Sequence, residues 1–259
     1  MSSTAPEAHA QSDIAPDVSA LVTEDDTPVD NLFSEKQQRL LTGPLYASWG
    51  GPPPDESGAR RTFLATANVG LFDTPKRPPL VPDAMVSLDV QAPDELWEKN
   101  HRSYFVWEYG KPPEVVIEVV SNREGDELGL KRRRYATMRV WHYVVWDPEL
   151  QISSKALQVF ELRGQFYGPM PRAFFPDLGL GLTVWKGRFE DVEAEWLRWC
   201  DADGNVLPTG EELARSERER ADNERTRADN ERTRADSERT RAERLAAKLR
   251  ALGIDPDAP

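Results

Sequence analysis

A short apolar run near the middle of the chain, residues 115–121, carries a carboxylate at its centre. The run is rich in β-branched residues and lies between Pro112-Pro113 and Ser121-Asn122, a pattern that is typical of a strand covered on both faces. An ionised Glu118 inside such a strand is costly unless a cation, a metal ion or hydrogen bonds compensate for it. The run therefore predicts a central strand and marks Glu118 as a candidate catalytic or metal-binding residue.

A second acid and a lysine stand in suitable places around this strand. Residues 81–88 also read as a strand, with Asp83 at its start after a proline, which suits a first strand position because proline has no N–H. Residues 126–138 are predicted to be helical, and Lys131 and Tyr135 lie four apart, hence on one face. Two carboxylates can hold a hard divalent cation such as Mg²⁺ or Mn²⁺, and an ammonium can orient a water and stabilise charge on phosphoryl oxygens. This set favours metal-dependent cleavage of a phosphodiester.

Each of these residues also has a purely structural interpretation. Glu118 can be a structural acid paired with a nearby arginine, and Asp83 can cap a turn. Lys131 opens a basic run, and such runs are usually solvated helix faces. Tyr135 is better suited to packing than to chemistry, so it stands only as a supporting residue.

The neighbouring polar positions have simpler roles. Ser121 follows the central strand and either bonds a site group or ends the strand. Asp126 and Glu127 favour the helix N-terminus through the helix dipole, which is explanation enough for both. A basic patch beside the proposed site offers candidate nucleic-acid contacts: Arg132, Arg133 and Arg134.

Strands and helices alternate around the proposed site. Further helices are predicted over residues 31–48 and 189–199, and further strands over 62–69, 140–146, 156–162 and 180–185. The alternation predicts an α/β core with a mixed sheet.

Four segments together carry a family resemblance: Pro82-Asp83, residues 118–121, Lys131 through Tyr135, and residues 143–148. In their order and spacing they resemble the Uma-two family, a branch of the PD-(D/E)XK restriction-endonuclease-like superfamily, over about residues 31–200. The resemblance implies a restriction-endonuclease-like core, a central mixed β-sheet flanked by helices, with Asp83 and Glu118 as ligands of Mg²⁺ or Mn²⁺.

The chain departs from the superfamily pattern at the lysine. That pattern places a lysine two residues after the second acid, where this chain has Val120. The resemblance implies that the lysine has moved to the following helix, which points to Lys131. It also implies a glutamate in the N-terminal helix, for which Glu35 is the candidate.

Charge argues against tight binding of nucleic acid. The net charge is −12, of which residues 1–30 carry −7, residues 31–210 carry −4 and residues 211–259 carry −1. A strong non-specific DNA binder normally shows a positive field. A single cysteine, Cys200, fits a reducing compartment, and we expect no membrane span, no secretory signal and a cytoplasmic location.

The two ends differ from the core. Residues 1–30 are rich in Ala, Ser, Pro and acids and are predicted to be disordered. Residues 211–254 contain a seven-residue repeat, which predicts a long charged helix, and residues 255–259 form a tail. Each repeat offers a single alanine and no large apolar partner, so a solvated helix is preferred to a coiled coil. A homodimer through the domain or this helix is the alternative.

Two functions of different classes follow. The first is a metal-dependent endonuclease acting on nucleic acid, with DNA as the expected substrate. The second is a non-catalytic module on a nuclease fold that recruits partners through its helical tail, because a fold alone does not decide a function.

Overall fold

The computed structural model describes residues 16–19, 21–23 and 31–251. The chain forms two compact units, residues 1–209 and 210–259. Most of the segment predicted to be disordered, and the predicted tail 255–259, lie outside the described residues.

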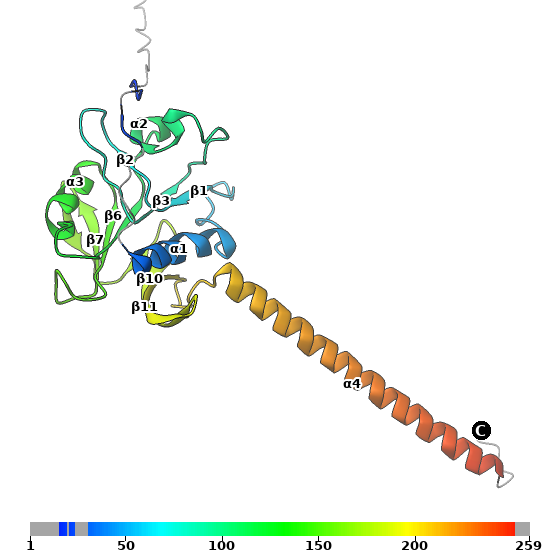
Figure 1. Ribbon diagram of the computed structural model, residues 1–259. Coiled ribbons are helices and arrows are strands. Elements are labelled where there is room, and N and C mark those ends of the chain that lie inside the picture. Colours follow the sequence, from blue (N-terminus) through cyan, green and yellow to red (C-terminus); the bar gives the residue numbers. More distant parts are fainter. Residues whose placement is uncertain (1–15, 20, 24–30, 252–259) are drawn as a thin grey trace, which may run out of the picture. The chain divides into compact units, whose positions relative to one another are not determined.

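The first unit is built on a six-stranded mixed sheet (Figure 1). In order across the sheet its strands are β1 (Phe63–Thr66), β3 (Ala84–Leu88), β5 (Val115–Val119), β6 (His142–Trp146), β7 (Leu157–Arg163) and β8 (Phe166–Pro169). Only β5 and β6 pair in parallel, and the other neighbours within this sheet are antiparallel. The predicted α/β class with a central mixed sheet is confirmed.

The predicted central strand is β5, and every one of its residues is buried. Its side chains alternate between two hydrophobic clusters, because successive strand residues point to opposite faces. Val115, Ile117 and Val119 join one cluster, and Val116 joins the other. The alternation places Glu118 on the same face as Val116.

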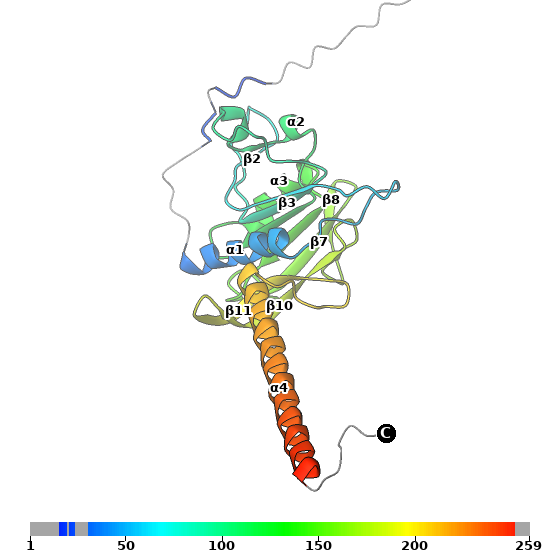
Figure 2. The ribbon, with the colours of Figure 1, turned by 90° about the vertical axis from the view of Figure 1, so that its right-hand side faces the viewer.

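Helices cover both faces of the sheet (Figures 1 and 2). On one face, α1 (Leu32–Ala47) contributes Leu41 and Leu45 to the first cluster. A second sheet, β9 (Phe174–Phe175), β10 (Leu180–Phe189) and β11 (Val192–Cys200), packs into the same cluster. On the other face, α3 (Arg132–Thr137) packs through Tyr135, which lies in the second cluster.

The predicted helix 126–138 has an irregular start. Its first turn, η2 (Glu127–Lys131), is a π-helix, and α3 continues from it. Asp126 precedes the turn in the left-handed region, with φ of 51°, and its carboxylate accepts a hydrogen bond from the Leu130 amide at 2.8 Å. Asp126 therefore acts as the helix cap that its sequence position indicates.

The predicted helix 189–199 is wrong. These residues belong to a long antiparallel hairpin in which β10 pairs with β11 from Gly181–Cys200 to Phe189–Val192. Glu190 and Asp191 connect the strands, both at positive φ, as a two-residue hairpin turn of the favoured twist requires. Ladder pairing and the burial of Trp196 and Trp199 outweigh the local helical pattern.

Small elements complete the first unit. Strands β2 (Leu71–Phe72) and β4 (Tyr104–Phe105) form a parallel pair, followed by the single turn of α2 (Val106–Tyr109). A 3₁₀ turn, η1 (Lys99–His101), lies in the connection between β3 and β4.

The second unit is the helix α4 (Gly210–Ala251), as the seven-residue repeat predicted. None of its described residues is buried. Ion pairs one turn apart, such as Arg234 with Glu238 and Arg239 with Glu243, support it. Whether α4 forms a coiled coil stays a prediction. No helix in the described part of the chain combines the length and apolar character needed to cross a membrane.

Candidate active site

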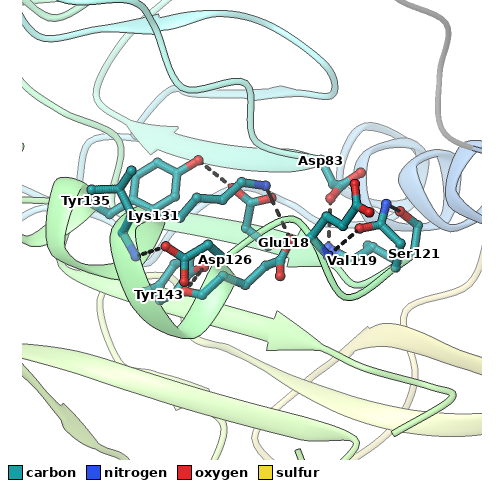
Figure 3. A network of polar contacts seen from close by, with 12 residues as sticks. Asp83, Glu118, Val119, Ser121, Asp126, Lys131, Tyr135 and Tyr143 are labelled. Carbon is teal, nitrogen blue, oxygen red and sulfur yellow. Dashed lines mark hydrogen bonds and ion pairs between the residues drawn. The ribbon is translucent and has the colours of Figure 1, made fainter. Parts of the chain in front are cut away.

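The carboxylate in the central strand is bound by two side chains of the following helical segment. Glu118 is 1% exposed. Its Oε2 accepts a hydrogen bond from Lys131 Nζ at 2.8 Å, and its Oε1 accepts one from Tyr135 Oη at 2.6 Å (Figure 3). The i, i+4 spacing therefore aims Lys131 and Tyr135 at the same carboxylate, and the alternative of a structural pair with an arginine is not what the structure shows.

The second predicted acid lies next to the first. Asp83 comes just before β3 and is 9% exposed. Its Oδ2 accepts a hydrogen bond from the backbone N–H of Val119, the residue after Glu118, at 2.7 Å (Figure 3). The antiparallel pairing of β3 with β5, in which Ala84 lies opposite Ile117, creates this contact. Asp83 and Glu118 thus come together from strands that are distant in sequence.

Burial and charge shift the titration of this cluster. The pKa of Glu118 is raised to about 7, first by burial and then by the negative charge of Asp83, while Lys131 acts in the opposite direction. Burial acts to lower the pKa of Lys131, but the ion pair with Glu118 and the charge of Glu127 outweigh it, so this pKa is raised. Lys131 is therefore an ammonium at neutral pH.

A third acid, Glu127, belongs to this cluster. Glu127 is 5% exposed, and its Oε1 lies 3.5 Å from Lys131 Nζ. Its Oε2 is buried without a hydrogen-bond partner. Gly125 leaves room for the carboxylate, since a Cβ at that position would lie 1.8 Å from Glu127 Oε1. A favourable interaction with the helix dipole therefore does not explain Glu127 fully. The four-residue spacing between Glu127 and Lys131 is the sequence feature that indicates their contact.

The residue of α1 that reaches the site is a glutamine and not the predicted Glu35. Gln38 Nε2 donates to Asp83 Oδ1 at 2.7 Å, and the Gln38 side chain also exchanges hydrogen bonds with Asn68. Glu35 instead forms an ion pair with Arg39 at 2.8 Å, with both side chains more than two-fifths exposed. The one-turn difference along α1 decides which side chain faces Asp83.

The side chains that could bind a metal ion here are two carboxylates. No group of three or more His, Cys, Asp or Glu side chains with the geometry of a metal site occurs in the described ranges. Asp83 and Glu118 are the oxygen donors that could share one cation, since Mg²⁺ is commonly held by one or two carboxylates together with waters.

Comparison with protein-family models shows which family the chain resembles. A family model described as "Putative restriction endonuclease", Uma2, matches residues 27–173. The chain belongs to the Uma2 family. No curated protein matches the chain. The Uma2 match spans α1 through the β7–β8 hairpin and includes Asp83, Glu118, Lys131 and Tyr135, and it points to a nuclease.

The other predicted site residues of the Uma2 domain have structural contacts. Ser121 accepts a hydrogen bond from Asn122 at its Oγ and one from Gln151 at its backbone oxygen. Arg134 donates to the backbone oxygen of Pro78. Arg132 lies with its guanidinium carbon 5.3 Å from the centroid of the Phe160 ring, and Arg133 is exposed.

Proposed function

We propose that this Uma2 protein is a metal-dependent endonuclease that hydrolyses phosphodiester bonds of nucleic acid, with DNA as the expected substrate. The observation that carries the proposal is the ion pair between the buried Glu118 and the part-buried Lys131 beside Asp83. Two buried acids held beside a part-buried ammonium are costly for stability, which favours a functional use over a structural one.

The donor set fits a hard divalent cation. Asp83 and Glu118 supply carboxylate oxygens, the ligands that Mg²⁺ and Mn²⁺ prefer. Burial, and then the negative charge of Asp83, raise the pKa of Glu118, and a bound cation would stabilise the ionised carboxylate. When bound, such a cation supplies Lewis-acid stabilisation of a phosphoryl oxygen and activates a water.

The remaining residues position these groups. Lys131 carries the positive charge that orients a water nucleophile and stabilises charge on the phosphoryl oxygens. Tyr135 fixes one oxygen of Glu118, and Gln38 fixes one oxygen of Asp83. Glu127 lies one turn before Lys131 in the same helical segment, and its carboxylate forms an ion pair with the Lys131 ammonium.

A second candidate function is a non-catalytic partner-binding module. Both oxygens of Glu118 already have protein partners, and Val120, at the superfamily's lysine position, is buried in the core. The exposed surface of α4 would then recruit the partner.

Plasmid cleavage distinguishes the two candidates. Supercoiled plasmid is incubated at low salt with Mg²⁺, Mn²⁺ or EDTA and with wild type, Glu118→Gln, Lys131→Ala and the exposed control Glu193→Gln. The nuclease predicts metal-dependent nicking by wild type and the control only. Cleavage that survives in Lys131→Ala would remove that residue from the mechanism. A folded wild type that cleaves neither DNA nor RNA would favour the binding module.

A further inference from the structure

A separate pocket of about 500 Å³ lies between α3 and the edge strand β8. Three guanidinium groups, a glutamine and two aromatic rings contribute to its lining: Arg132, Arg133, Arg139, Gln165, Phe166 and Tyr167. None of the described residues that line this pocket is acidic. We call it the arginine pocket.

The three arginines of this pocket place positive charge together in a chain whose net charge is −12. Over the described part of the chain, none of the three forms an ion pair with a carboxylate, whereas Arg39, Arg61 and several arginines of α4 do. Arg139 lies in the left-handed region, with φ of 68°, and donates to the backbone oxygen of Gly164. The fold therefore holds positive charge at this pocket without neutralising it.

An exposed aromatic ring lies beside these charges. Phe166 lies at the start of β8 and is 77% exposed, although its ring is apolar. The neighbouring Tyr167 is held in place, since its Oη donates to the backbone oxygen of Val140 at 2.7 Å. A free aromatic face next to guanidinium groups matches how proteins bind unpaired nucleotides, by stacking bases and contacting phosphates.

We propose that the arginine pocket binds an unpaired stretch of nucleic acid, with Arg133 and Arg139 on its phosphates and Phe166 stacked on a base. The proposal rests on the proposed function for its substrate class, and it adds a binding site to that function. Lys131 directly precedes Arg132, so one helical segment connects the carboxylate site with the pocket.

Binding is measured by fluorescence anisotropy with a short labelled single-stranded DNA, in EDTA so that metal-dependent cleavage does not occur. The variants are Arg133→Glu and Phe166→Ala, both at exposed side chains. Arg188→Glu and Trp97→Ala are matched controls, since Arg188 and Trp97 are also exposed and lie outside the pocket lining. Urea unfolding of each variant checks that the fold is retained.

We expect Phe166→Ala to weaken binding about fivefold or more, the effect of losing one base stack. Arg133→Glu is expected to weaken binding and to reduce the slope of log affinity against log salt by about 0.7. Both controls should bind as wild type does. Folded variants that bind as tightly as wild type, or a wild type without measurable binding at low salt, would overturn the proposal.

The binding and cleavage assays together distinguish failure of the pocket proposal from failure of the nuclease proposal. Binding that depends on Arg133 and Phe166 in a protein that never cleaves would support the pocket and refute the nuclease. Metal-dependent cleavage by wild type together with unchanged binding by both variants would refute the pocket and leave the nuclease standing.

Discussion

The buried Glu118 should make the protein less stable as the pH rises from about 4.5 to about 7. Its pKa is raised from 4.5 to about 7, with burial as the main cause. Between these values the folded state retains a proton that the unfolded chain has released, so the free energy of unfolding falls as the pH rises. The difference between the two pKa values corresponds to about 3 kcal/mol.

Glu118→Gln removes this titration and keeps the shape of the side chain. The amide oxygen can accept from Lys131 and the amide NH₂ can donate to the Tyr135 oxygen, but the Tyr135 hydroxyl then loses Glu118 Oε1 as its acceptor at every pH. Apart from this constant loss, we expect the variant and wild type to be similarly stable near pH 4.5. Above pH 7 the stability of the variant relative to wild type should be higher by up to about 3 kcal/mol than near pH 4.5, although the variant should not cleave nucleic acid.

Urea unfolding followed by tryptophan fluorescence measures this difference, because all eight tryptophans lie in the first unit. His142, whose pKa burial lowers, changes the stability in the opposite sense over a similar range, but it is present in both proteins and cancels in the comparison. Glu193→Gln serves as the exposed control. A difference between Glu118→Gln and wild type that does not change with pH would refute the reasoning.

Three further predictions concern activity. The cleavage rate should rise as the pH increases through about 7, because a proton on Glu118 competes with the metal, and initial rates that are flat across this range would contradict that role. Glu127→Gln should move the alkaline limb of the rate profile to lower pH, since Glu127 raises the pKa of Lys131; an unmoved limb would show that Glu127 does not act through the lysine. Gln38→Ala should reduce activity or metal affinity about 10–100-fold, as loss of a ligand's hydrogen-bond partner commonly does. A metal titration of the cleavage rate measures this last effect, and an unchanged midpoint and rate would exclude a supporting role for Gln38.

Local patterns predicted the parts of the site that lie within one element. The covered apolar run identified β5 and the buried Glu118, and the four-residue spacing of Lys131 and Tyr135 placed both on one helix face. The match to the family model confirmed the suspected Uma2 resemblance. Along α1, by contrast, the sequence indicated a helix but not which of its polar side chains would meet Asp83.

The sequence by itself determined the helix and strand periodicities of the core, the charged helix α4 and the identity of the two acids, because these follow from side-chain spacing within single elements. The tertiary structure alone decided the contact of Gln38 with Asp83, the burial of Glu127 and the hairpin that replaced a predicted helix. The arginine pocket also forms only in the tertiary structure, because residues of α3 and of the edge strand β8 line it together. Such features depend on strand register and packing between segments distant in sequence, and no local spacing encodes them.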